Sequence, residues 1–347
     1  MTEKDKSIIL GWLKKWKRLL IGLATIGLII LMIFLVNFPR LIQKIVTIGI
    51  WGLVLFILMY TLAFILRAYK LKLIFKGLDL DISYSTSYFS TGASFLINDS
   101  TPGKLGDVAK VFLIRDREGI KLSESVAGIA IERILDLILL FVISAFALIY
   151  LYLGNFNNIG ILGQNIQFYL MIGAIFILLI LSLMFLAIYK TDFVINISKK
   201  FSPKLADYLR RFIINFKKGI RKYKNHKKEF VFIVLLGFPT WFVDAYIVTI
   251  FFHLSGYQLN MILLILAIIL SFLSKIFPIS PGGWGISENV GALFIFFLYP
   301  TFLGGYTEIL SIFVIDHLFR SAYLLFFGGY SIFHYNINLR ELEAIKT

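Results

Sequence analysis

The sequence contains no cysteine and few charged side chains. Without cysteine the chain can form no disulfide, no thiolate metal site and no thiol nucleophile. Charged residues make up 16% of its 347 residues, whereas soluble domains carry about 25%. Apolar residues account for 59%, and the mean hydropathy is +0.85. This composition excludes an ordinary soluble protein and indicates a membrane protein.

Motifs of several enzyme classes are missing as well. The chain has no His-Glu-x-x-His pattern, no Gly-x-x-x-x-Gly-Lys-Ser/Thr loop and no Gly-x-Ser-x-Gly elbow. Asp79 and Asp81 have the Asp-x-Asp spacing with which sugar-nucleotide transferases hold a metal ion, but so short a match often arises by chance. We therefore expect no catalytic residue, no metal, no other cofactor and no enzymatic activity.

Seven mostly apolar stretches are each long enough to cross a hydrocarbon core of roughly 30 Å. They are Leu19–Val36, Ile45–Leu66, Ser125–Leu153, Ile166–Tyr189, Glu229–Phe252, Gln258–Phe277 and Tyr306–Phe333. The shorter segment Ile286–Tyr299 could form an eighth span in a tilted or thinned bilayer. The expected fold class is all-α: a polytopic transmembrane helix bundle of about seven to eight spans, some of them broken or re-entrant.

Basic residues are distributed unevenly between the loops. Lys and Arg number 6 in residues 1–18, 9 in residues 67–124 and 13 in residues 190–228, against two in residues 37–44. The positive-inside rule then places the amino terminus and both long basic loops in the cytoplasm of a multi-pass protein of the cell membrane. Because these charges lie in loops, nucleic acid is not an expected partner.

The expected organisation is a basic amphipathic tail, one membrane domain and a short tail, at residues 1–18, 19–333 and 334–347. Residues of about 192–228 alternate apolar and cationic positions at helical spacing. This pattern predicts a helix that lies on an anionic leaflet or packs its apolar face on the bundle.

A short motif occurs twice in the chain. Thr-Pro-Gly-Lys-Leu-Gly-Asp at 101–107 recurs as Ser-Pro-Gly-Gly-Trp-Gly-Ile-Ser-Glu at 280–288, with apolar segments on both sides of each copy. Pro-Gly ends a helix, and the later glycine lets the backbone approach closely as the next helix begins. The pattern is typical of a broken or re-entrant helix, and paired interruptions of this kind mark the binding site in transporters. Two ordinary turns outside the membrane are the alternative.

Charged residues also lie inside the predicted spans, where each costs roughly 2.5–3.5 kcal/mol at a helix centre. Glu132, Arg133 and Asp136 lie in the third span; Asp244 lies alone in the fifth; Asp316, His317 and Arg320 lie in the last. Their spacing lets Arg133 pair with Asp136 and Asp316 pair with Arg320 on one helix face. Such pairs either staple helices together or line a shared cavity, where a guanidinium group suits a phosphate.

These motifs together resemble the transmembrane domain of lysylphosphatidylglycerol synthases, a flippase-like family, over roughly residues 19–333. Its members are implicated in moving lipids between leaflets, and some are fused to aminoacyl-transfer or glycosyl-transfer domains. The matching positions are Pro102, Gly103, Gly106, Glu132, Arg133 and Asp136 in the first half, with Pro281, Gly282, Gly283, Gly285, Glu288 and Arg320 in the second. Asp107 stands where the family usually has an acidic residue. The soluble aminoacyl-transferase domain of the full-length synthases does not appear in this sequence, so synthase activity is not expected.

The resemblance and the motifs predict a protein that translocates or binds an anionic lipid or a polyprenyl-phosphate-linked lipid. Helix starts near Gly106 and Gly285 would offer free N–H groups to a phosphate, and Arg133 and Arg320 would supply charge. The candidate head-group site is Pro102, Gly103, Gly106, Asp107, Glu132, Arg133, Asp136, Asp244, Pro281, Gly282, Gly283, Gly285, Glu288, Asp316 and Arg320. The expected partners are membrane lipids.

Two other functions fit the same sequence. The chain could be an accessory or acceptor-lipid-binding subunit of a membrane glycosyltransferase or aminoacyltransferase, in which case a separate transferase is a partner. It could also be a membrane scaffold, in which case changes at Arg133 and Arg320 would have no effect.

Overall fold

The computed structural model describes residues 38–101, 104–153, 191–275, 280–299 and 304–335, together with Gly27 and single positions between 171 and 190. Within these ranges the chain is helical and contains no strand. The predicted all-α fold class is therefore confirmed.

Four helices are long and apolar enough to cross a membrane: α2 (Phe38–Lys76), α5 (Leu122–Leu153), α9 (Lys227–Leu254) and α12 (Gly305–His334). They correspond to four of the predicted spans. The predicted span Gln258–Phe277 is shorter in the structure, because α10 covers only Met261–Ser274. Most of the predicted spans Leu19–Val36 and Ile166–Tyr189, the amino-terminal tail and most of the tail at 334–347 lie outside the described residues, so the total number of spans stays a prediction.

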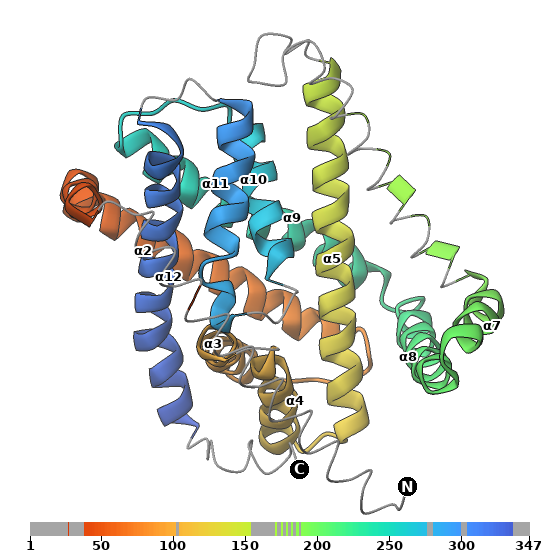
Figure 1. The fold of residues 1–347 in the computed structure, drawn as a ribbon. Coiled ribbons are helices and arrows are strands. Elements are labelled where there is room, and N and C mark those ends of the chain that lie inside the picture. The colour runs from red at the N-terminus through yellow and green to blue at the C-terminus, as the bar shows by residue number, and fades with distance from the viewer. Residues whose placement is uncertain are drawn as a thin grey trace, which may run out of the picture.

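The long helices enclose the two repeated motifs. In Figure 1, α5 (yellow) and α12 (blue) stand on opposite sides, with α10 and α11 (Ser287–Leu298) between them. The helices α2 and α9 pack against each other, and their apolar side chains form the main core with α10, α11 and α12. Phe56 and Phe251 are stacked at its centre with their ring centroids 6.0 Å apart.

The first motif joins two helices that lie between α2 and α5 in the sequence. These are α3 (Tyr84–Ser100) and α4 (Leu105–Glu118), which pack against each other near the lower end of α12 (Figure 1). A Cβ on Gly106 would overlap the backbone carbonyl oxygen of Ser94, so only glycine permits this approach of α4 to α3. The predicted broken helix is confirmed here, although Pro102 and Gly103 themselves lie outside the described residues.

The segment 67–124, counted as a basic loop in the predicted topology, is largely helical. It contains the end of α2 and the packed helices α3 and α4. Three of its nine basic residues, Arg67, Lys70 and Lys110, are buried with 7%, 1% and 0% exposure. The basic residues that support a cytoplasmic position are consequently fewer than counted.

The second motif forms a tight turn between α10 and α11. A short 3₁₀ helix covers Pro281–Gly283, and Gly282, Gly283 and Gly285 have φ values of +60°, +82° and +81°. Side chains other than glycine rarely adopt this conformation. A Cβ on Gly282 would lie 2.7 Å from the carbonyl oxygen of Asp99, at the end of α3. The two breaks, which lie far apart in the sequence, therefore pack directly against each other.

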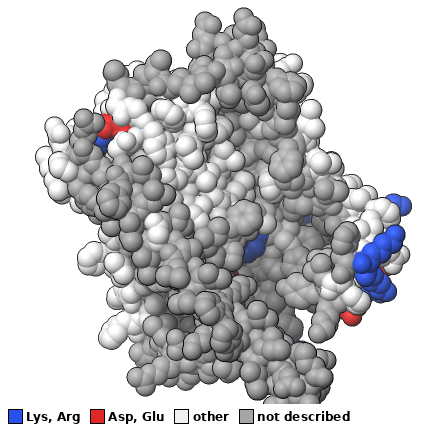
Figure 2. Space-filling view, viewed as in Figure 1, with Lys and Arg blue, Asp and Glu red and all other residues white. Residues whose placement is uncertain are grey.

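The basic segment forms two helices, α7 (Thr191–Phe201) and α8 (Pro203–Lys222), which lie beside α5 in Figure 1. The α8 residue Phe216 and the following Tyr223 are buried in an apolar cluster with α2 and α5, and the Tyr223 hydroxyl donates to the Ile74 carbonyl oxygen over 2.7 Å. Exposed Lys and Arg side chains cover part of this region in Figure 2. The structure thus contains the predicted packing on the bundle, and contact with an anionic leaflet stays a prediction.

Two polar contacts show which helix ends lie together. The turn after α2 meets the turn after α8, because Asp79 Oδ1 lies 2.9 Å from His226 Nε2. At the start of α2, Lys44 forms an ion pair with Glu308 in the first turn of α12. α2 and α12 therefore begin at the same end of the bundle.

Candidate functional site

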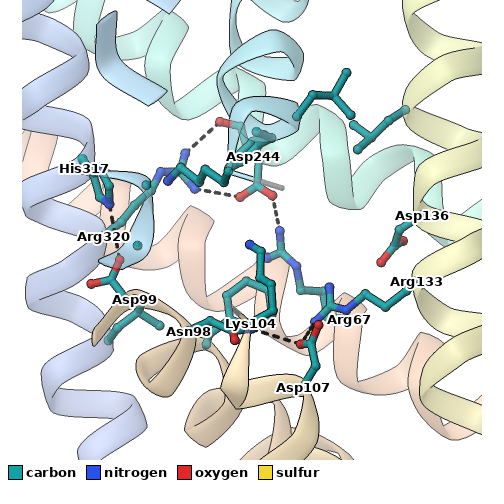
Figure 3. A pocket seen from close by; sticks show the side chains of 18 of the residues that line it. Arg67, Asn98, Asp99, Lys104, Asp107, Arg133, Asp136, Asp244, His317 and Arg320 are labelled. Carbon is teal, nitrogen blue, oxygen red and sulfur yellow. Dashed lines mark hydrogen bonds and ion pairs between the residues drawn. The ribbon is translucent and has the colours of Figure 1, made fainter. Parts of the chain in front are cut away.

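A cavity of about 320 Å³ lies among α2, α3, α5, α9 and α12. Both breaks reach it: Thr101 and Lys104 line it from the first, and Ser280 and Gly282 line it from the second. Figure 3 shows side chains of α5 and α12 approaching this space from opposite sides. The charged residues of its wall are Arg67, Asp99, Lys104, Asp107, Glu132, Arg133, Asp136, Asp244, Lys275 and Arg320, with His317 beside them. Both halves of the chain thus contribute to one polar cavity.

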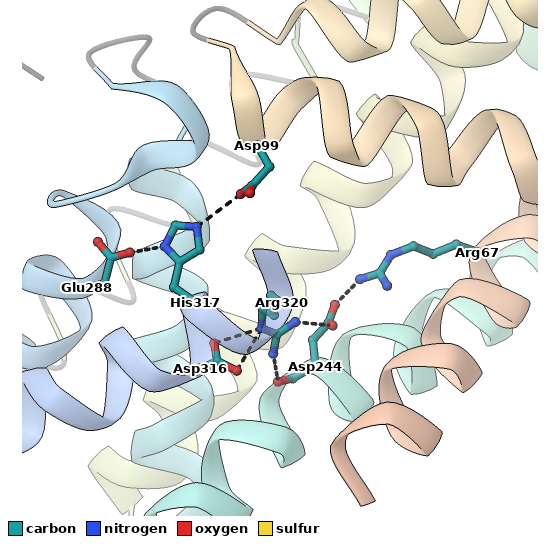
Figure 4. Close-up of polar contacts among 7 residues, drawn as sticks. All are labelled: Arg67, Asp99, Asp244, Glu288, Asp316, His317 and Arg320. Carbon is teal, nitrogen blue, oxygen red and sulfur yellow. Dashed lines mark hydrogen bonds and ion pairs between the residues drawn. The ribbon is translucent and has the colours of Figure 1, made fainter. Parts of the chain in front are cut away.

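Asp244 links two arginines on one side of the cavity. Arg320 Nη1 donates to Asp244 Oδ1 over 2.9 Å, and Arg320 Nη2 donates to the Asp244 backbone carbonyl oxygen over 3.0 Å. The other carboxylate oxygen of Asp244 accepts from Arg67 (Figure 4). Arg320 Nε also donates to both oxygens of Asp316 over 2.9 Å, as the i,i+4 spacing predicted. Asp244, predicted to lie alone, is a fully buried bridge between α2 and α12.

The predicted pair of Arg133 with Asp136 is wrong. Arg133 pairs with Asp107 of α4, and Asp136 pairs with Lys70 of α2. The spacing argument failed because the neighbouring helices α2 and α4 also carry charged side chains. Arg133 and Asp136 each meet a partner of opposite charge on one of these helices.

Glu132 follows the same rule. Its carboxylate accepts from Lys110 Nζ of α4 over 2.9 and 3.0 Å, and neither side chain is more than 4% exposed.

The N–H groups of Gly106 and Gly285 are not free for a ligand, which corrects the prediction at these two positions. The Gly106 N–H donates to Asn98 Oδ1, and the Gly285 N–H donates to Glu288 Oε2, each over 2.8 Å. These side chains act as local caps, because a buried N–H needs an acceptor. The two glycines therefore shape the packing of the breaks, and charge for a ligand has to come from side chains.

The remaining predicted residues divide into three groups. Gly282 and Gly283 line the cavity. Glu288 and Asp316 are buried beside it, at 1% and 9% exposure, and contact residues of its wall. Pro281 begins the short 3₁₀ helix.

Two lysines in the cavity wall, Lys104 and Lys275, form no ion pair with any residue that the structure describes. Lys104 occupies the left-handed position before α4, with φ +58°. The stem of Lys275 lies over the second break, where a Cβ on Gly283 would come within 2.6 Å of its Cγ. Its Nζ lies 5.6 Å from the centre of the Phe272 ring. These are the cavity cations with capacity for a further anion.

Unpaired hydrogen-bond donors occur in the same wall. Among the described residues, the buried side-chain nitrogens without a partner are Arg67 Nη1, Arg133 Nε and Trp241 Nε1, and all three residues line the cavity. A buried donor without an acceptor costs about 1–3 kcal/mol. The wall therefore contains N–H donors without an acceptor. Its carboxylates, in contrast, each have a partner: Asp99, Asp107, Glu132, Asp136 and Asp244.

The other part of the wall is apolar. It consists of Tyr60, Phe95, Leu137, Leu140, Trp241, Phe272, Leu273 and Leu324. The cavity thus combines a donor-rich polar part with a surface that suits hydrocarbon.

Sequence reasoning missed several of these residues, although some carried a signal. Arg67 and Lys70 lie just beyond the predicted end of the second span at Leu66, yet the helix continues to Lys76. Lys104 lies inside the first motif itself. Lys275 lies inside the predicted span Gln258–Phe277, where a charge is a signal, whereas nothing in the sequence indicated that Asp99 lines the cavity.

The Asp79 and Asp81 pair is not part of the cavity. Asp79 lies in an exposed turn, where hydrogen bonds from His226 and Lys222 lower its pKa. No group of three or more His, Asp or Glu side chains that could hold a metal ion occurs within the described ranges.

Comparison with known families agrees with this architecture. Residues 19–328 match the family described as the lysylphosphatidylglycerol synthase transmembrane region. The chain belongs to this family. It is thus an integral membrane protein whose family region spans both breaks, α2, α5, α9 and most of α12.

Three relatives illustrate the range of similarity. A UPF0104 membrane protein of Methanocaldococcus jannaschii is 27% identical over 55% of this chain and 75% of its own length. A UPF0104 membrane protein of Pyrococcus horikoshii is 24% identical over 82% and 87%. A Haloferax volcanii protein named glycosyltransferase AglD is 22% identical over 72% of this chain but only 44% of its own length. No solved structure matches the chain significantly.

Proposed function

We propose that the cavity holds the phosphate-bearing head group of an anionic lipid, either a phospholipid or a polyprenyl-phosphate-linked lipid, and that the protein carries this lipid across the membrane. The observation that supports this most directly is the pair of unpaired lysines, Lys104 and Lys275, in one wall with unpaired N–H donors. Such a wall favours a ligand with negative charge and several acceptor oxygens.

A phosphate fits this requirement better than a cation or a neutral sugar. A cation would need a free carboxylate, and every carboxylate of the wall already has a partner. A phosphate carries charge together with several acceptor oxygens, and guanidinium and ammonium groups are its usual ligands in proteins.

The apolar wall and the size of the cavity support a lipid over a free phosphate. About 320 Å³ lies near the lower limit of small-molecule sites, which span about 300–1,000 Å³. That volume suits a head group, so the hydrocarbon chains would extend past Phe95 and Leu140 between the helices.

In this proposal the wall residues have separate roles. Lys104 and Lys275 supply charge to the phosphate, while Arg67 and Arg133 supply directed N–H groups. Asp244 and Asp316 hold Arg320 in place rather than meeting the ligand. We place the protein in the cell membrane with its amino terminus in the cytoplasm, because most exposed basic residues lie on that side of the predicted topology.

A second candidate function is acceptor-lipid binding without transport. It is favoured by the relative named a glycosyltransferase, whose matched region covers 44% of that protein. In this case the cavity presents a lipid phosphate to a transferase on another chain.

Transport by purified protein in vesicles tests both functions. The vesicles carry fluorescent phosphatidylglycerol or a fluorescent polyprenyl phosphate, and an impermeant quencher reports movement between leaflets. We expect wild-type protein to move at least one anionic probe faster than fluorescent phosphatidylcholine, and we expect Lys104→Gln with Lys275→Gln to slow it by about tenfold or more. Lys218→Gln, an exposed lysine of α8, is the matched control.

The outcomes separate the proposals. Binding of an anionic probe without movement, lost in the double variant, would favour acceptor-lipid binding. Equal binding and movement by wild type and the double variant would rule out the cavity as the head-group site. Absence of binding and of movement in both proteins would leave the scaffold alternative.

A further inference from the structure

His317 lies at the point where the two breaks meet α12. Its Nδ1 forms a hydrogen bond with Glu288 of α11, and its Nε2 lies 3.3 Å from Asp99 Oδ1 at the end of α3 (Figure 4). His317 is 3% exposed, and Glu288 is 1% exposed. His317 and Asp99 also line the cavity, so this cluster adjoins the proposed head-group site.

The two hydrogen bonds of this cluster require one more proton than the neutral ring supplies. An ionised carboxylate only accepts hydrogen bonds, and a neutral imidazole has a single N–H. Both contacts of His317 are to carboxylate oxygens. Either the ring is an imidazolium, or one carboxyl group is protonated. Loss of that proton would place a nitrogen lone pair against a carboxylate oxygen.

The surrounding contacts keep the ring in this position. The Trp284 indole, in the second break, stacks on the imidazole with the ring centroids 4.0 Å apart and the planes 10° apart. The Gly285 N–H holds Glu288 from the other side over 2.8 Å. His317 therefore cannot avoid an unfavourable contact simply by turning away.

Charges on several neighbouring elements face the cluster. Lys275, after α10, lies within electrostatic reach of both Glu288 and Asp99. Lys104, before α4, lies within reach of Asp99. Asp316 and Arg320 lie on α12, the helix that carries His317. Arg320 is linked to Asp244 on α9, and Asp244 is linked to Arg67 on α2. Tyr306 lies within electrostatic reach of Glu288.

We propose that Asp99, His317 and Glu288 form a proton-binding site that takes up one proton when the cavity binds an anionic head group and releases it when the head group leaves. The inference rests on the proposed function. An anion near Lys104 and Lys275 adds negative charge beside Asp99 and offsets the lysines that otherwise repel a proton. The protonated cluster is then favoured.

Linkage makes the effect reciprocal. Any factor by which the anion strengthens proton binding is also the factor by which the proton strengthens anion binding. The sequence contains no nucleotide-binding motif that would supply energy for transport. In this proposal a proton gradient drives lipid movement through the linkage. Because Asp99 and Glu288 flank the two breaks, proton release would also loosen the contact of both breaks with α12.

The test measures the pH dependence of binding with probes that do not titrate themselves. We use a short-chain phosphatidylglycerol and a short-chain polyprenyl phosphodiester, whose single negative charge is constant between about pH 5.5 and 9. Calorimetry in buffers of different ionisation enthalpy counts the protons taken up. For wild type we expect uptake approaching one proton per probe over part of this range, and a Kd that rises by up to about tenfold per pH unit there.

Two variants and a control locate the effect. His317→Gln and Asp99→Asn keep hydrogen-bonding groups but cannot titrate near neutral pH, and we expect either to bind without the pH-dependent proton uptake. If the melting temperature shows that His317→Gln does not fold, Asp99→Asn alone provides the test. His334→Gln, whose ring packs on Phe89 and Tyr330 near the end of α12, should behave as wild type.

The failures of the two proposals look different. Wild-type binding with constant affinity and no proton uptake across the range would overturn the proton site and leave the proposed function intact. Proton uptake that persists in both His317→Gln and Asp99→Asn would also overturn it. Binding of neither probe at any pH would overturn the proposed function and the inference with it.

Discussion

Lys110 of α4 and Glu132 of α5 form a buried ion pair in which Nζ lies 2.9 and 3.0 Å from the two carboxylate oxygens. Removal of one partner leaves an uncompensated buried charge, which typically costs 3–5 kcal/mol. We expect Lys110→Met to lower the melting temperature strongly and Lys110→Met with Glu132→Leu to recover most of the loss. Lys76→Met, which breaks the more exposed pair with Glu229, is the control and should have little effect. A Lys110→Met protein that melts as wild type would contradict the buried pair.

The partners of Arg133 and Asp136 lead to a prediction about coupling. Since Arg133 pairs with Asp107 and Asp136 pairs with Lys70, Arg133→Met and Asp136→Leu should show only weak coupling in stability, from the longer-range attraction of their charges. The double variant leaves two charges on neighbouring helices without partners, so it should not regain stability. By contrast, Arg133→Met and Asp107→Asn should show a coupling energy. A double-mutant cycle of unfolding free energies measures the coupling of each pair. Strong coupling of Arg133 with Asp136 would show that these two residues form the ion pair predicted from their spacing.

Gly106 and Gly329 provide a matched pair of glycine substitutions. A Cβ on Gly106 would overlap the Ser94 carbonyl oxygen, whereas a Cβ on Gly329 of α12 meets nothing within 4 Å. Gly106→Ala should therefore separate α3 from α4 and cost about 1–3 kcal/mol. Gly329→Ala should be neutral or stabilising, because alanine favours the helix by up to about 1 kcal/mol. Equal melting temperatures of the two variants would show that the close approach of α4 to α3 is not required.

The sequence predicted the overall fold well because its strongest signals are local. A long apolar run specifies a membrane helix by itself, so four spans appear near their expected positions. The Pro-Gly motifs likewise predicted two broken helices, because proline and glycine limit the backbone wherever they occur.

Side-chain partners could not be predicted in the same way. The pair of Asp316 with Arg320 lies within one helix turn and was found, whereas Asp244 meets arginines 76 and 177 residues away. Contacts of this kind depend on how the helices pack, which no spacing rule along one helix contains. The free N–H groups expected at Gly106 and Gly285 were wrong for a related reason, because short side chains nearby already cap them.

The exposed turn after α2 should give a small pH dependence of stability. Hydrogen bonds from His226 and Lys222 lower the pKa of Asp79 in the folded state. A carboxyl group with a lowered folded pKa contributes stability above its unfolded pKa, about 3.9, and the contribution is lost as the pH falls through the folded pKa. Asp79→Asn keeps a residue that tolerates the observed φ of +59° and removes the charge. We expect the variant to melt slightly below wild type at pH 7, with a difference that shrinks below about pH 4. A difference that grows on acidification would have the wrong sign.

The orientation of the bundle can be tested with introduced cysteines, because the native chain has none. The hydrogen bond between Asp79 and His226 places Asn225 at the end of the bundle where α2 finishes, while Gln43 lies at the end where α2 begins. Residues 67–124 and 190–228 contain more Lys and Arg than residues 37–44, even when the buried Arg67, Lys70 and Lys110 are left out. The positive-inside rule therefore predicts that Asn225 is cytoplasmic.

The expected result is that an impermeant thiol reagent labels Gln43→Cys but not Asn225→Cys in intact cells, and labels both after permeabilisation. Both positions are exposed, so a lack of labelling reports the side of the membrane rather than burial. The same reagent should fail to reach Arg117→Cys in intact cells, because the Arg117 guanidinium donates to the carbonyl oxygen of Tyr335 over 2.6 Å and places the ends of α4 and α12 together. Labelling of Asn225→Cys without Gln43→Cys would reverse the predicted topology and place the basic helices α7 and α8 outside the cell.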